Sequence, residues 1–428
     1  MKMSALVKRG LIVGLLFLSP CIPELASAQT GPGDDAVVMP KGYFRMFFDA
    51  QFYIPFDQRY NNSGQPESFG APLSVPLDTA TFPALAGLNP FLGGATASLG
   101  QSSVQIERNL QQYLFQPVYG LTDRLTIGMN IPYVMVKQNV SASVDSSPGS
   151  GANVGFSTIA SPFGPAGSIV PIALVPGTRR ATLQDINNQL GSQFGLAPVQ
   201  TWEDEGIGDI EAGGRYQYYR GANFRAALTS GVRFPTGHVD DINNLVDVGW
   251  GTGAYALLFQ FNQDFMLQKD GLGKRLGFPT PGEFFINTTF RYDLNLPNKQ
   301  MARVCAPGVV CNNLDNVSRN LGDVLAVDVS GKVGLLTNGL IFVPRFWYSY
   351  KERDQFSGDK GYAYGDLALE TQRTEYIYFL SLLYSTIPLV AEGKFWLPGS
   401  ISVTYRDRFA GTNVPKSQYV GFTVQVYF

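Results

Sequence analysis

The chain has 428 residues, of which 45% are hydrophobic and 13% aromatic, but only 15% carry a charge, against roughly 25% in an average soluble domain. This composition argues against an ordinary cytosolic enzyme. Outside the N-terminus no apolar stretch reaches the roughly 18 residues of a membrane-spanning helix, which excludes a polytopic helical membrane protein. A net charge of −2 gives no basis for a nucleic-acid partner. One histidine and three cysteines leave little material for metal or acid–base chemistry, so we expect no cofactor and no metal.

The N-terminal segment has the pattern of a secretory signal peptide. Lys2, Lys8 and Arg9 precede a short apolar run over 11–18, and Ala26-Ser27-Ala28 offers a cleavage site. We therefore predict a signal peptide over 1–28 and a mature chain over 29–428. Cys21 faintly resembles a lipoprotein cleavage site, but the proline directly before it disfavours that interpretation.

Beyond residue 40, apolar and polar residues alternate with a period of two, which is typical of strands with one apolar and one polar face. In 43–54, for example, Phe44, Met46 and Phe48 alternate with Arg45 and Asp49. The pattern predicts twelve strands over 43–54, 105–119, 125–137, 209–219, 224–234, 247–261, 284–294, 322–335, 340–351, 374–385, 400–408 and 418–428. The segments 105–119 and 374–385 show no clear parity, so which of their faces points outward stays undecided.

The connections between these strands fall into two classes. Tight turns are predicted at 120–123, 220–222 and 337–339, whereas long segments rich in Gly, Pro, Ser and Asn cover 55–104, 138–207, 235–246, 295–321, 352–372 and 409–417. Short turns on one side and long loops on the other, with an even strand count, predict an all-β fold: a transmembrane antiparallel up-and-down β-barrel of about 12 strands with long extracellular loops. Two turn-side links, 263–282 and 386–398, are longer than that layout prefers.

A closed barrel satisfies every backbone hydrogen bond inside lipid, because it has no open sheet edge. We therefore expect the chain in the outer membrane of a Gram-negative bacterium, in contact with outer-membrane lipid and lipopolysaccharide. The alternative is a secreted β-sandwich, whose strands also alternate. The last strand argues for the barrel, because Val420, Phe422, Val424, Val426 and Phe428 occupy every second position. Phe428 is then the assembly signal that the barrel assembly machinery would recognise.

Cys305 and Cys311 enclose five residues of a polar stretch. Export to an oxidising compartment favours a disulfide between them. A metal site is the competing interpretation, but no further Cys or His lies nearby.

Two stretches resemble a known family. The segment YGLTDRLTIGMNIPY over 119–133, and GIGDIEAGGRY over 206–216 followed by GVRFPTG over 231–237, are similar to the meta-pathway phenol degradation family of outer-membrane barrels. The resemblance implies a channel associated with the degradation of aromatic compounds. It implies no catalytic or ligand residue for this chain.

The leading hypothesis for function is a channel that lets small molecules, above all hydrophobic or aromatic compounds, diffuse through a narrow lumen. The lumen-lining candidates share an inward position and a charge: Arg45, Asp49, Glu211, Arg215, Arg225, Arg233, Arg291, Asp293, Arg345 and Arg406. Each of them could brace the wall through ion pairs or contact the solute. We expect Glu211, Arg215 and Arg225 to form one group of ion pairs near the turn at 220–222.

Apolar patches in two long loops, 82–88 and 169–175, could line a site for aromatic solutes or could pack as a cap without a ligand.

A barrel hydrolase is the second hypothesis, and His238 is its one candidate residue. His238 could instead be a solvated loop residue, or hold a cation weakly with Asp240 and Asp241. A structural or surface-recognition barrel is the third hypothesis.

Overall fold

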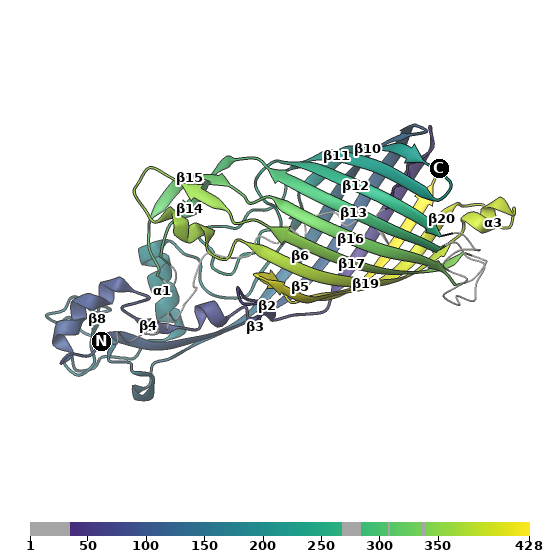
Figure 1. Cartoon of the computed structure of the whole chain (residues 1–428). Coiled ribbons are helices and arrows are strands. Elements are labelled where there is room, and N and C mark those ends of the chain that lie inside the picture. The colour runs from purple at the N-terminus through teal and green to yellow at the C-terminus, as the bar shows by residue number, and fades with distance from the viewer. Residues whose placement is uncertain (1–34, 268–283, 307–308, 336–338) are drawn as a thin grey trace, which may run out of the picture.

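The computed structural model describes residues 35–267, 284–306, 309–335 and 339–428. The predicted signal peptide and Cys21 lie outside the described residues. Within the described part, twelve antiparallel strands close into one barrel, because β1 pairs with β22 on one side and with β5 on the other (Figure 1). The strands are β1 (Phe44–Tyr53), β5 (Ser98–Thr122), β6 (Leu125–Asp145), β10 (Ile210–Arg220), β11 (Phe224–Phe234), β12 (Ala256–Leu267), β13 (Phe284–Asn295), β16 (Val324–Gly334), β17 (Leu340–Lys351), β19 (Arg373–Ser385), β20 (Gly399–Thr412) and β22 (Gln418–Tyr427).

The alternation in the sequence is realised as an apolar exterior and a more polar interior. Phe290 and Phe422 point outward and are 47% and 49% exposed, whereas the inward Asn287 is 3% exposed. Side chains alternate across a strand, so one register assigns every residue to lipid or lumen. An exterior of this kind requires a surrounding of low polarity, as in a membrane.

The structure shows which residues point inward in the two strands for which the sequence left this undecided. In β5 the even positions point inward, including Leu110, Gln112 and Leu114, and in β19 the odd positions Ile377 and Phe379 do. Apolar residues therefore occupy both faces of these strands. This mixture explains why the alternation was hard to read there.

The predicted strand over 247–261 is wrong in its first half. Strand β12 begins only at Ala256, and 247–255 belong to a loop that folds over the barrel mouth. Gly249, Gly251 and Gly253 interrupt this stretch, and Gly253 takes a left-handed conformation with φ of +66°, which does not continue a strand. The glycines at every second position resemble the alternation of a strand, but in the described part of the chain this stretch forms no strand hydrogen bonds to a neighbouring strand.

The turn end of the barrel is close to the expected layout. Residues 123–124 join β5 to β6, and 221–223 join β10 to β11. The predicted turn at 337–339 lies mostly outside the described residues, as does most of the predicted link 263–282. The link 386–398 contains the short helix α3 (Ile387–Ala391). The C-terminus is at this end (Figure 1).

The opposite end carries a large cap, which we define as the loop segments 54–97, 146–209, 235–255, 296–306, 309–323, 352–372 and 413–417 with the protruding ends of β5 and β6 (Figure 1). Its elements are β2 (Gln58–Tyr60), β3 (Pro66–Ser68), η1 (Ala71–Leu73), β4 (Pro76–Asp78), η2 (Pro83–Phe91), η3 (Pro148–Ser150), β7 (Val154–Phe156), β8 (Ile169–Pro171), α1 (Leu183–Phe194), β9 (Trp202–Ile207), β14 (Asn298–Arg303), β15 (Leu314–Asn320), β18 (Gln355–Ser357), η4 (Tyr364–Ala368) and β21 (Val414–Pro415). Among the described residues, no helix combines the length and apolar character needed to cross a membrane.

The cap has its own hydrophobic cores. One lies near the barrel mouth and includes Phe56, Phe69 and Trp250, and a second lies farther out and includes Leu85, Phe156 and Ile186. The apolar patches 82–88 and 169–175 both contribute to the second core. Of the two roles that the sequence left open for these patches, the structure therefore shows the packing role.

Candidate functional site in the barrel lumen

Four charged side chains form a closed ring in the lumen. Glu211 of β10 accepts hydrogen bonds from Arg233 of β11 and Arg291 of β13, each with a nitrogen–oxygen distance of 2.9 Å. Asp293 of β13 completes the ring, at 2.7 Å from both Arg233 and Arg291. All four are 2–9% exposed. We call this set the charge ring.

The strand register explains how the charge ring forms. Glu211 lies directly opposite Arg233 in the β10–β11 pair. Arg233 reaches β13 across β12, where its register neighbour is the small Ala256. Each buried charge in the ring has two partners of opposite sign, which is the condition under which a buried ion pair is tolerated.

The predicted group of Glu211, Arg215 and Arg225 is not formed. Glu211 and Arg215 are four residues apart on one strand, which separates them by roughly 13 Å at about 3.3 Å per residue. Arg215 instead donates to Thr229 Oγ1 at 2.8 Å and to the carbonyl oxygen of Asp35 at 2.7 Å. Arg225 lies opposite Arg220 on one side and Asp264 on the other.

The remaining lumen candidates contact residues of the wall or of the adjoining edge of the cap. Arg345 donates to Asp328 at 2.7 Å and lies over the ring of Phe379. Arg406 donates to Ser417 Oγ at 2.8 Å and lies over Tyr419.

Asp49 accepts hydrogen bonds from Gln51 and Thr423, both at 2.7 Å, and Arg45 lines a cavity in the turn-side half of the barrel. The hydrogen bonds of Asp49 and Arg345 join neighbouring strands of the wall.

The segment 35–39 enters the lumen, which no pattern in the sequence indicates. Asp35 accepts from Lys332 Nζ at 2.7 Å, the backbone N–H of Ala36 donates to Asp264, and its carbonyl oxygen accepts from Gln217. Met39 donates from its backbone to Thr126 Oγ1 at 2.7 Å. Strands β6, β10, β12 and β16 thus hold this segment inside the turn-side half of the barrel.

A cavity of about 460 Å³, the turn-side cavity, lies beside this segment. Three inward glycines from neighbouring strands, Gly128, Gly213 and Gly231, pair in one row across its wall. A Cβ on Gly213 would approach Ser230 O to 2.4 Å, so no larger residue fits without displacement. The glycine row therefore hollows the wall at this level.

A second cavity, of about 270 Å³, lies between the cap and the barrel mouth, and we call it the cap-side cavity. The charge ring stands between the two cavities, because Arg233 lines the cap-side cavity while Glu211 and Arg291 line the turn-side cavity.

The loop 235–255 covers the mouth and forms part of the cap-side cavity. Asp209, fully buried, accepts from the backbone of Gly237 at 3.0 Å and from Thr252 at 2.8 Å, which fixes both ends of the loop. Trp250 is buried and donates its indole N–H to the carbonyl oxygen of Ile207.

His238 lies within this loop. In the described part of the chain its imidazole hydrogen-bonds to Asp247 alone, at 2.9 Å, and its ring lies against Trp250 and Trp202. These contacts stabilise the loop and place neither Asp240 nor Asp241 on the imidazole. Across the described residues there is no group of three His, Cys, Asp or Glu side chains that could hold a metal ion.

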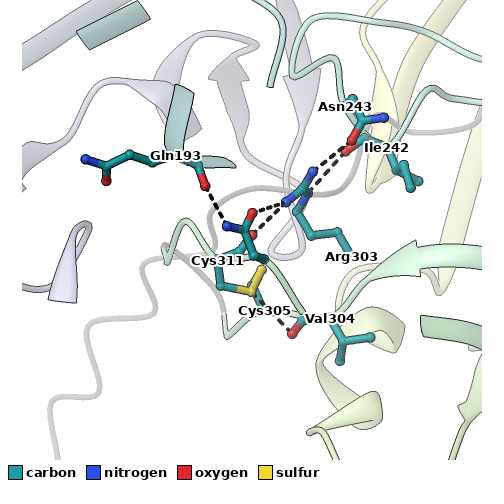
Figure 2. Close-up of a disulfide and its surroundings, with 8 residues drawn as sticks. Gln193, Ile242, Asn243, Arg303, Val304, Cys305 and Cys311 are labelled. Atoms are coloured by element: carbon teal, nitrogen blue, oxygen red, sulfur yellow. Dashed lines mark hydrogen bonds between the residues drawn. A yellow bond between two sulfur atoms is a disulfide. The ribbon is translucent and has the colours of Figure 1, made fainter. Parts of the chain in front are cut away.

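Cys305 and Cys311 form a disulfide in the cap (Figure 2). Next to it, Arg303 donates to the carbonyl oxygen of Cys311 and to Asn243 Oδ1, both at 2.8 Å. Asn312 donates to the carbonyl oxygen of Gln193 at the end of α1. The disulfide loop therefore joins the loop 235–255 to the outer part of the cap.

The sequence matches no family model and no curated protein. Among solved structures, the chain is similar to the COG4313 outer membrane channel from Pseudomonas putida F1, with 12% identity and a TM-score of 0.50 over 92% of this chain and 98% of that one. It is less similar to the monoaromatic hydrocarbon channel CymD (10% identity, TM-score 0.31, 91% and 88% covered) and to the Ralstonia pickettii toluene transporter TbuX (12%, 0.34, 93% and 92%).

The likeness to the first of these structures is one of fold. The first likeness agrees with the closed barrel and its apolar exterior. The chain has the fold of an outer-membrane β-barrel.

Proposed function

We propose that this protein is an outer-membrane channel through which small hydrophobic or aromatic compounds pass by diffusion. The observation that carries the proposal is the arrangement of two cavities on either side of the charge ring. A solute entering from the cap would reach the cap-side cavity, pass the charge ring, and leave through the turn-side cavity. An association with aromatic degradation, as the resemblance implies, is part of the proposal.

The walls of the two cavities support a solute of mixed character. The cap-side cavity offers Phe69, Leu73 and Ile106, and the turn-side cavity offers Phe47 and Val343 beside polar residues. Small-molecule sites are typically lined by apolar groups with a few polar ones, and both cavities add more charged side chains to such a lining. Passage would require the ring and the segment 35–39 to shift so that the two cavities connect. Assembly through Phe428 and contact with lipopolysaccharide remain parts of this proposal.

Reconstitution of the full mature protein into planar bilayers tests the proposal. We expect discrete current steps, and a reduction of the open-channel current when phenol is added. The matched control is Lys137→Ala with Glu203→Ala, which removes an exposed ion pair outside the lumen and should leave both readouts unchanged. A barrel that inserts but stays silent and insensitive to phenol would contradict the channel.

A further inference from the structure

The cap-side cavity is unusual in its charge. Six cationic side chains line it: Arg108, Arg233, Arg303, Arg319, Lys351 and Arg373. Only three acidic side chains do so: Asp240, Asp241 and Asp354. A cavity with low-dielectric walls and an excess of one sign concentrates ligands of the opposite sign.

Most of these cations already have partners of their own. Arg233 belongs to the charge ring, Lys351 contacts Asp354, and Arg319 donates to Asn298 and to the carbonyl oxygen of Thr252. These side chains contribute to the positive electrostatic potential of the cavity. Their hydrogen bonds to protein partners leave them less able to bind a ligand strongly.

Arg108 differs from the others. It is 2% exposed, lies over the ring of Phe69 at 4.5 Å, and donates through Nε and Nη2 to the side-chain oxygen of Gln138. Among the described residues its Nη1 has no hydrogen-bond partner. A buried donor without a partner is costly, and the cost is larger for a charged group.

Asp240 is the acidic group whose charge acts on Arg108, and its burial weakens it as a counter-charge at neutral pH. Burial, together with the neighbouring Asp247 carboxylate, raises the pKa of Asp240 to about 8, although Arg108 and Arg319 favour its charged form. The neutral form of Asp240 is therefore favoured at pH 7, which leaves Arg108 with a weak counter-charge.

The apolar part of the wall surrounds this charge. Phe69, Leu73 and Ile106 line the cavity with Arg108. A volume of about 270 Å³ is close to the lower limit of roughly 300 Å³ for small-molecule sites, which suits a ligand with a single ring.

We propose that the cap-side cavity binds small aromatic carboxylates, with the carboxylate accepting hydrogen bonds from Arg108 Nη1 and the ring lying against Phe69, Leu73 and Ile106. The arginine–carboxylate contact satisfies the buried donor and compensates its charge. A neutral hydrocarbon would leave Nη1 without a partner, and a small inorganic anion would leave the apolar wall uncovered. This inference deepens the proposed channel function, on which its role in uptake rests, by naming the class of solute.

Titration calorimetry on the full mature protein in detergent micelles, with benzoate as the probe, tests the inference at pH 7. Benzamide, which has the same shape without the charge, and inorganic phosphate are the comparison ligands. We expect benzoate to bind at least about tenfold more tightly than either. Equal binding of benzoate and benzamide would overturn the role of Arg108, and equal binding of benzoate and phosphate would overturn the role of the apolar wall.

The variant Arg108→Gln should weaken benzoate binding about tenfold or more and leave benzamide binding unchanged. The matched control is Arg179→Gln, which removes another cap arginine that lies over an aromatic ring, Phe156, away from the cavity. If Arg108→Gln does not fold, the ligand comparison on the wild-type protein still decides the inference.

These binding measurements do not depend on conduction. If the protein binds benzoate but conducts no current in bilayers, the proposed channel function is wrong and the carboxylate site is supported. Conduction with no preference for benzoate would leave the channel and refute the site.

Discussion

Glu211 lies directly opposite Arg233 across the β10–β11 pair, and its carboxylate also accepts from Arg291, two strands farther around the barrel. This relationship divides the interior into a cap-side and a turn-side cavity. The pair joins two strands of the wall and lies between the two cavities on the proposed path.

The first prediction concerns the stability of the charge ring. Arg291→Gln leaves Glu211 and Asp293 buried with one arginine between them, so the free energy of unfolding should fall by about 3–5 kcal/mol. Lys137→Gln, which breaks the exposed pair with Glu203, should change it by only about 0–1 kcal/mol. Urea unfolding in detergent micelles measures both. Equal effects of the two variants would show that the ring adds nothing beyond a surface pair.

The second prediction concerns conductance. Glu211→Ala combined with Arg233→Ala removes two long side chains from the ring in a charge-neutral way and leaves Arg291 paired with Asp293. Single-channel conductance should rise, because the narrowest part of the path becomes wider. Lys137→Ala with Glu203→Ala is again the control, and an unchanged conductance in the ring variant would place the constriction elsewhere.

The third prediction concerns the segment 35–39. Lys332 and Arg215 hold Asp35 from two sides of the barrel, so Lys332→Met with Arg215→Gln should loosen the segment. We expect a larger and more variable single-channel current. Lys394→Met, which changes an exposed lysine in the link 386–398, should not alter it. The segment plays no part in conduction if both variants behave alike.

The fourth prediction concerns the disulfide. Replacing Cys305 and Cys311 by serine should destabilise the cap by about 2 kcal/mol, because a short cross-linked loop restricts the unfolded chain. The barrel itself should keep its stability, since the disulfide lies in the cap (Figure 2). Limited proteolysis should then cut the loops 235–255 and 296–323 sooner, while the heat-induced shift of the barrel on gels stays the same. If the variant loses the protease resistance of the cap loops and the heat-induced gel shift of the barrel together, then cap and barrel unfold together.

The fifth prediction concerns pH. Because the pKa of Asp240 is raised to about 8, Asp240 loses its proton as the pH rises through that value, and its carboxylate then competes with benzoate for Arg108. The other groups that face Asp240 are Arg319 and Asp247. Benzoate binding should weaken between about pH 6.5 and about pH 9, and Asp240→Asn should remove the dependence.

The same raised pKa has a consequence for stability. The folded protein retains a proton that the unfolded chain releases above about pH 4, so the contribution of Asp240 to stability falls as the pH rises from there to about 8. Asp240→Asn should flatten this part of the unfolding profile. A profile that is identical in the variant would mean that Asp240 titrates normally.

The sequence by itself determined the number of barrel strands and, for most of them, the faces they present. Alternation located β11 and β17 to the residue, because the two-residue period is a local property of the chain. The register of Glu211 and Arg233 did not follow from the sequence, because a bulge between Gln217 and Tyr219 shifts the β10–β11 pairing by one residue. The group predicted from the sequence, Glu211 with Arg215 and Arg225, was therefore wrong, because Glu211 pairs with Arg233 and Arg291.

Only the tertiary structure decided which charges meet around the barrel and what fills it. Arg291 reaches Glu211 because closure brings β13 near β10, and the segment 35–39 lies in the lumen because four separate strands offer it hydrogen bonds. Arg108 Nη1 is buried without a partner among the described residues, in the cavity that forms between the cap and the barrel mouth. Contacts of this kind join residues distant in sequence, and no local pattern records them.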